Sequence, residues 1–105
     1  MVSDPKLSEI CNRLVQAFHP LAIHLFGSKA RGDATVESDY DLVMVVKQSS
    51  EPMYKRIQRV RPILRGIGVA VDIIVMTEQE FQSQSDVVAS LPATVLREGK
   101  KLDVA

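Results

Sequence analysis

Residues 21–47 read LAIHLFGSKARGDATVESDYDLVMVVK, and this stretch decides the fold. Two apolar segments, 21–26 and 39–47, flank a polar stretch rich in Gly, Ser, Asp and Thr. Short apolar runs bounded by turn residues predict buried strands, so we expect strands at 21–26 and 39–47. Between them we expect a turn at Gly27, at most one helical turn from Ser28, and a loop. The first strand thereby delivers Gly27 and Ser28 to one edge of a sheet.

The flanking segments alternate between helix and strand patterns. Upstream, apolar residues recur at helical spacing from Leu7 to Phe18, with Asp4 as a candidate N-cap. Downstream we expect a helix from Glu51 to about Arg65 that Pro62 kinks or ends early. The remaining expected elements are a strand at 69–76, a helix from Glu78 begun by a Thr77–Glu80 capping box, and a last helix at 86–98 with Pro92 as a break and Gly99 as the stop. This alternation predicts an α/β (α+β) domain built on a small sheet backed by helices.

Composition limits the possible classes of protein. The chain has 105 residues, which predicts one domain over 1–105, and its 13 Lys and Arg balance 13 Asp and Glu. A zero net charge excludes a basic field over the whole molecule, so we expect nucleic acid not to be the direct substrate. The longest apolar run has five residues, so we expect no membrane segment. One cysteine and no signal-peptide pattern predict a cytoplasmic protein.

Two carboxylates stand at the start of the second predicted strand. Asp39 and Asp41 are two positions apart, so their side chains leave the same face of the strand and Tyr40 leaves the other. Such a pair resists burial unless a cation or hydrogen-bond donors offset its charge. Oxygen ligands without Cys or His favour Mg²⁺ or Mn²⁺ over zinc. Acidic pairs are also common where a strand begins in solvent. When Asp39 and Asp41 are considered by themselves, that alternative stays open.

The glycine and serine that follow the first strand suit a phosphate group. A glycine there lets the backbone approach closely, and the following N–H groups with the Ser28 hydroxyl can donate to phosphate oxygens. The segment is not a Walker A loop, because Asp33 stands where that motif requires Gly-Lys-Ser/Thr. It is not an EF-hand, because Leu42 and Val43 follow Asp41.

Asp72 is the lone charge in the apolar strand VAVDIIV. If this strand pairs beside the second one, Asp72 can complete a triad with Asp39 and Asp41. Three carboxylates can hold two Mg²⁺ ions about 3.5–4 Å apart for an in-line displacement at phosphorus. An ion pair of Asp72 with a basic neighbour is the alternative.

The string GSKARGDATVESDYDL, residues 27–42, resembles the minimal nucleotidyltransferase (MNT) family of the polymerase β-type nucleotidyltransferase superfamily. This resemblance implies a mixed sheet backed by helices, Mg²⁺ (two ions, or Mn²⁺), and ATP or another nucleoside triphosphate as substrate. It implies phosphate contacts from Gly27 and Ser28, metal ligands at Asp39 and Asp41, and Asp72 as ligand and base. Arg31 and Ser38 are further candidate nucleotide contacts, although Arg31 could instead pair with Asp33 or Glu37.

A chain of this length leaves little room for a domain that holds an acceptor. The resemblance implies a helical HEPN-type toxin encoded nearby as partner, with the chain acting as antitoxin by transferring AMP to a partner hydroxyl. Two alternatives are a non-catalytic neutralising partner and a nucleotidyltransferase for small molecules of the antibiotic type. We interpret Cys11 and His24 as structural and Lys29 as a solvated charge. A basic cluster forms either a solvated face or a docking face: Lys55, Arg56, Arg59, Arg61 and Arg65.

Overall fold

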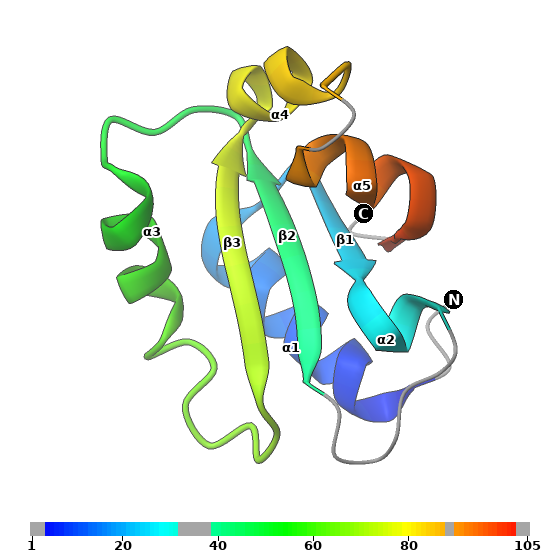
Figure 1. Cartoon of the computed structure of the whole chain (residues 1–105). Helices are drawn as coiled ribbons and strands as arrows, with labels where there is room; N and C mark the ends of the chain where they lie inside the picture. Colours follow the sequence, from blue (N-terminus) through cyan, green and yellow to red (C-terminus); the bar gives the residue numbers. More distant parts are fainter. Residues whose placement is uncertain (1–3, 32–38, 88–89, 103–105) are drawn as a thin grey trace.

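The computed structural model describes residues 4–31, 39–87 and 90–102 (Figure 1). In chain order its elements are α1 (Pro5–Phe18), β1 (Ala22–Phe26), α2 (Gly27–Arg31), β2 (Tyr40–Val46), α3 (Met53–Val60), β3 (Val71–Thr77), α4 (Glu78–Gln84), α5 (Leu91–Glu98) and β4 (Lys100–Leu102). None of the helices within these ranges is long and apolar enough to cross a membrane.

The strands form one mixed sheet in the order β3-β2-β1-β4. β1 pairs antiparallel with β2 and with β4, whereas β2 and β3 are parallel and are joined through α3. Because β1 and β2 are antiparallel, the end of β1 lies beside the start of β2. Because β2 and β3 are parallel, the start of β3 lies on the other side of β2, next to the same end. Three neighbouring strands therefore contribute residues to one edge of the sheet.

The first helix forms because its sequence combines a strong start with one apolar stripe. The Asp4 carboxylate accepts hydrogen bonds from the N–H groups of Lys6 and Leu7, and Pro5 occupies the first turn. The helix ends at His19, which adopts a left-handed conformation with φ of 48°. Its stripe is buried against the sheet: Leu7, Ile10, Cys11 and Leu14.

Each face of the sheet packs against its own set of helices, as Figure 1 shows. Tyr40, Leu42 and Met44 of β2 lie in a core with α1 and with Val60 at the end of α3. Val43 and Val45, which point to the other face, lie in a second core with residues of α4 and α5. Asp41 shares the face of Val43 and Val45, so it lies on the side of the sheet opposite α1.

Most of the expected elements are confirmed, and the structure differs from the expectation at α5 and at β4. α3 ends at Val60, two positions before Pro62, which confirms the early end of that helix. α5 begins at Leu91 rather than near Asp86, because Ser90 caps it and Pro92 lies in its first turn, where a missing N–H costs no hydrogen bond. Pro92 therefore starts this helix and does not break it. The three-residue strand β4 was not expected.

Candidate active site

Gly27 and the Asp41 carboxylate are in close contact. Phe26, the last residue of β1, is the antiparallel partner of Asp41 in β2, so the following residue passes directly over the aspartate. Gly27 has φ of +74°, a backbone conformation that residues other than glycine adopt only at a cost in free energy. A Cβ at Gly27 would overlap Oδ2 of Asp41 and lie 3.2 Å from its Cγ. The glycine is therefore required both by the backbone and by the carboxylate packed against it.

Asp72 lies beside Asp41 on the neighbouring strand. The two residues are direct partners in the parallel pairing of β2 and β3, so their side chains leave the same face of the sheet. This confirms the expectation that the third predicted strand pairs beside the second. Asp41 is half-buried, Asp72 is exposed, and Asp39 is exposed immediately before β2. All three carboxylates belong to the edge of the sheet where β1 ends and where β2 and β3 begin.

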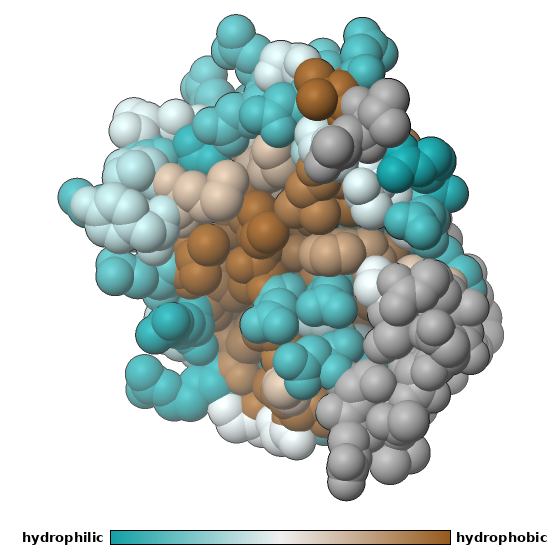
Figure 2. All heavy atoms as spheres, viewed as in Figure 1, coloured by the Kyte–Doolittle hydropathy of each residue, from teal (hydrophilic) through white to brown (hydrophobic). Residues whose placement is uncertain are grey.

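An apolar surface covers the middle of the sheet and not the edge that carries the carboxylates (Figure 2). On the face of the sheet that carries Asp41, partly buried apolar side chains border the second core: Phe26, Met53, Ile74 and Leu91. Figure 2 shows an apolar surface over the middle of the sheet, with hydrophilic residues toward the lower ends of β2 and β3 in this view. The carboxylates thus lie at the hydrophilic end of this face, beyond the apolar surface.

The donor set suits a hard divalent cation. Asp41 and Asp72 contribute carboxylate oxygens from adjacent strands in register. The backbone of Gly27 packs directly against the Asp41 carboxylate. Within the described ranges, no three His, Cys, Asp or Glu side chains are gathered closely enough to bind one metal ion. By their chemistry the carboxylate oxygens of Asp41 and Asp72 suit Mg²⁺, which prefers oxygen ligands.

Three of the candidate nucleotide contacts fall where the structure gives no side-chain description. Ser38 lies outside the described residues, as do the side chains of Ser28 and Arg31. The backbone of both latter residues belongs to α2, which begins at Gly27. The expected helical turn after β1 is thus confirmed, and the roles of these three residues remain predictions.

The basic cluster is not a uniformly solvated face. Arg56 is buried: its guanidinium donates to both carboxylate oxygens of Glu80 in α4, at 2.7 and 3.1 Å, and to the carbonyl oxygen of Val75 in β3. Arg59 forms a bidentate ion pair with the Glu51 carboxylate. The docking hypothesis is therefore wrong for Arg56, whose charge joins α3, β3 and α4. The other four cations of the cluster are exposed: Lys55, Arg59, Arg61 and Arg65.

Two of the side chains expected to have no catalytic role are buried, and a third contacts an aromatic ring. Cys11 is buried, and burial raises the pKa of its thiol to about 11, which confirms a structural role. His24 is also buried, with its ring stacked on Phe81 at 5.2 Å between centroids. The expectation that Lys29 is a solvated charge is wrong, because its ammonium lies 4.4 Å from the centre of the Tyr40 ring.

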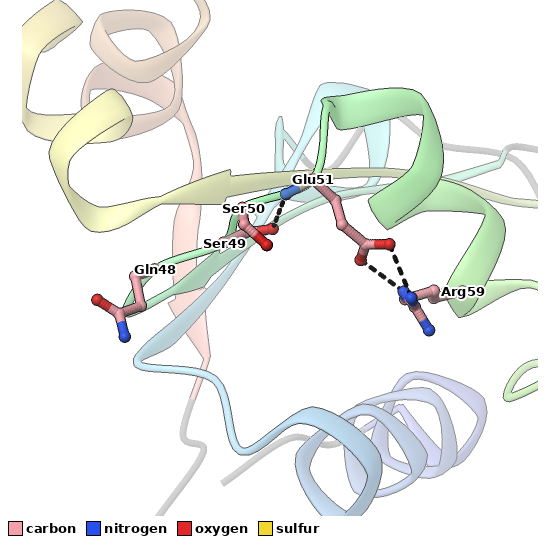
Figure 3. Close-up of a pocket in the computed structure, with 5 residues that line it drawn as sticks. All are labelled: Gln48, Ser49, Ser50, Glu51 and Arg59. Carbon is pink, nitrogen blue, oxygen red and sulfur yellow. Dashed lines mark hydrogen bonds and ion pairs between the residues drawn. The ribbon is translucent and has the colours of Figure 1, made fainter.

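Two cavities lie away from the carboxylates. One, of about 670 Å³, is lined by Gln48, Ser49, Ser50, Glu51 and Arg59 (Figure 3). Figure 3 shows Glu51 and Arg59 joined on one side of it and Gln48 on the other. A second cavity shares four of these residues and reaches down to Phe18 and Met44. Both lie toward the end of β2 that is opposite Asp41, and neither is lined by Asp39, Asp41 or Asp72.

Comparison with known proteins agrees with this arrangement. Residues 5–101 match the nucleotidyltransferase domain family. A crystal structure from Sulfolobus solfataricus, assigned as a nucleotidyltransferase, is 32% identical, with a TM-score of 0.60 over 74% of this chain and 69% of that one. A toxin–antitoxin crystal structure with AMP-PNP is 20% identical and has the same fold, with a TM-score of 0.64 over 93% of this chain and 72% of that one. No curated protein matches the sequence. The family match over nearly the whole described chain, together with the Gly27–Asp41–Asp72 edge, establishes that this chain belongs to the nucleotidyltransferase domain family.

Proposed function

We propose that this protein transfers a nucleoside monophosphate, AMP from ATP, to a hydroxyl group of a partner protein. The observation that carries the proposal is the register of Asp41 with Asp72 beside the Gly27 backbone. This edge offers carboxylates for cations and a close backbone approach for phosphate within one small region. The likeness to a toxin–antitoxin structure with AMP-PNP supports a toxin as the partner and an antitoxin role for this chain. The helical HEPN type of that toxin is proposed from the sequence resemblance.

Each residue then has a defined task. The backbone at Gly27 and Ser28 holds the phosphates, and Arg31 and Ser38 contact the nucleotide. Magnesium ions bound by Asp39, Asp41 and Asp72 would activate the acceptor hydroxyl and neutralise charge on the leaving pyrophosphate. The acceptor oxygen bonds to the α-phosphorus as the bond to the pyrophosphate oxygen breaks. Asp72, the most exposed of the strand-borne carboxylates, accepts the acceptor's proton.

Co-expression with the protein encoded beside it tests this proposal. The partner should gain the mass of one AMP or a small multiple when it is produced with the wild-type chain. Asp39→Asn should abolish the gain. Asp86→Asn, which removes an exposed carboxylate at the end of α4, is the matched control and should leave the gain intact.

Two outcomes would replace the proposal. An unmodified partner that the Asp39→Asn variant still neutralises would make this chain a binding module. Transfer of AMP to a small hydroxylated compound, with the partner unmodified, would make it a small-molecule nucleotidyltransferase.

A further inference from the structure

Tyr40 stands between two of the candidate metal ligands and points away from them. Asp39 precedes it, Asp41 follows it, and its own side chain is buried on the α1 face of the sheet. The backbone N–H of Tyr40 donates to the carbonyl oxygen of Ala70, at 3.0 Å, which ties the start of β2 to the approach to β3. Whatever fixes Tyr40 therefore fixes the backbone that carries both carboxylates.

The Tyr40 hydroxyl is tied to the first turn of α1. It donates a hydrogen bond to Oδ2 of Asp4 at 2.6 Å, across 36 positions of sequence. Oδ1 of the same carboxylate accepts hydrogen bonds from the N–H groups of Lys6 and Leu7. The Asp4 carboxylate therefore caps α1 and also accepts the hydrogen bond from Tyr40. The bond from Tyr40, aided by these N–H groups, lowers the pKa of Asp4. Burial and the Asp4 contact raise the pKa of Tyr40 to about 12, so the donor keeps its proton.

The same aromatic ring is in contact with α2. The ammonium of Lys29 lies 4.4 Å from the ring centroid, within range of a cation–π interaction. Lys29 follows Gly27 by two residues in a five-residue helix. Its charge also favours the ionised form of Asp4. Tyr40 therefore contacts the α1 cap through its hydroxyl and the Lys29 side chain of α2 through its ring.

We infer that Asp4, Lys29 and Tyr40, here called the Tyr40 cluster, are positioning residues that set the Gly27 turn relative to the carboxylates of Asp39 and Asp41. This inference rests on the proposed function. The phosphates are held from the turn and the cations from the strand, so in-line transfer depends on the distance between the two. A misplacement of about 1 Å in such a reaction can cost roughly a hundredfold in rate. A cluster that contacts both parts is suited to fix that distance.

Two variants remove the hydrogen bond between the Tyr40 hydroxyl and the Asp4 carboxylate, one by changing the donor and the other by changing the acceptor. Tyr40→Phe keeps the ring beneath Lys29 and removes only the hydroxyl. Asp4→Ser keeps an N-cap for α1 and is too short to reach Tyr40. Each should lower kcat for nucleotide transfer about tenfold and change the KM for the triphosphate less than threefold. The double variant should be no worse than either single one, because both remove the same interaction.

Two controls separate positioning from stability. Tyr54→Phe removes a hydroxyl from an exposed tyrosine on α3 and should leave kcat unchanged. Thr77→Ala removes the α4 cap at the opposite end of β3, and should lower Tm while leaving kcat unchanged. A Tyr40→Phe enzyme with wild-type kcat would overturn the inference. So would a kcat loss that Thr77→Ala reproduces at an equal drop in Tm, or a double variant with additive losses.

Amide hydrogen exchange provides a readout that needs no activity. Exchange at Ala30 in α2 and at Asp41 in β2 should accelerate in Tyr40→Phe and Asp4→Ser and stay unchanged in Thr77→Ala. A wild-type chain that binds and transfers no nucleotide would defeat the proposed function. The exchange data would then decide alone whether the cluster fixes the turn, and unchanged exchange would overturn that role.

Discussion

The hydrogen side chain of Gly27 leaves room for the Asp41 carboxylate, and replacing it tests the contact at the scale of one residue. Gly27→Ala should lower stability and abolish Mg²⁺-dependent binding of ATP, because the new methyl group displaces Asp41. Gly66→Ala is a matched control: Gly66 has a similar φ of +78° and nothing within 4 Å of an added Cβ. It should cost only the strain of a left-handed residue, about 1–2 kcal/mol. Calorimetry that finds equal ATP affinity in both variants would contradict this account.

The three aspartates should divide the work between binding and proton transfer. Asp39→Asn and Asp41→Asn remove proposed ligands of the cations that hold the triphosphate, so both should weaken Mg²⁺-dependent ATP binding and lower turnover by orders of magnitude. Asp72→Asn should bind ATP more nearly like the wild type and still lose transfer, because its proposed task is to accept the proton. Calorimetry and single-turnover transfer measure the two effects. An equal loss of ATP affinity in all three variants would refute this division.

At the scale of elements, the contact of Arg56 with Glu80 joins α3 to α4. Glu80 also completes the capping box of α4, accepting from the N–H of Thr77 at 2.8 Å. The hydrogen bonds from Arg56, followed by the bond from that backbone group, lower the pKa of Glu80 from 4.5 to about 2. A carboxylate whose pKa falls on folding stabilises the fold above its unfolded pKa and loses that contribution as pH falls through the folded one.

Thermal unfolding against pH tests this junction. Glu80→Gln should have a lower Tm than the wild type near neutral pH. The difference should shrink as pH falls from about 4.5 toward about 2, where the wild-type carboxylate becomes protonated. Glu78→Gln changes an exposed carboxylate two positions earlier in the same helix; it is the control and should show no such convergence. A Glu80→Gln difference that is constant over this window would rule out the ionised pair as its cause.

The elements that the sequence predicts are those whose signals are local. Asp4 with Pro5 marks the start of α1, and Thr77 with Glu80 marks the start of α4, each within a few positions. β4 has three residues, Lys-Lys-Leu, too few to show an alternation. The burial of Arg56 depends on a partner 24 positions away, which no local pattern contains.

The same distinction applies to the candidate site. Strand alternation predicted the common face of Asp41 and Asp72 once their strands were taken as neighbours, and the parallel register confirms that placement. The bond from Tyr40 to Asp4 spans 36 positions, and Lys29 meets Tyr40 only because α2 folds back beside β2. Spacing could therefore indicate the carboxylates, whereas their supporting contacts required the three-dimensional fold.

At the scale of the whole molecule, the candidate site joins parts of the chain that are far apart in sequence. The turn after β1, the start of β2 and the start of β3 meet at one edge, and α1 supports that edge from behind through Asp4. A ligand that bridges the turn and the two strands would bind only the folded chain. Its binding free energy therefore adds to the stability of the entire domain.

Thermal unfolding with and without ligand measures this coupling. A ligand at a hundred times its Kd adds about 2.7 kcal/mol to stability. For a domain of this size each kcal/mol raises Tm by about 4–8 °C, so ATP with Mg²⁺ at that concentration should raise Tm by roughly 10 to 20 °C. ATP without the cation should give a much smaller rise, because Asp39 and Asp41 would then face the triphosphate as like charges. Asp39→Asn should remove most of the cation-dependent part, whereas Asp86→Asn should retain all of it. A rise that is the same with and without Mg²⁺, or that Asp39→Asn leaves intact, would show that the triphosphate binds somewhere other than this edge of the sheet.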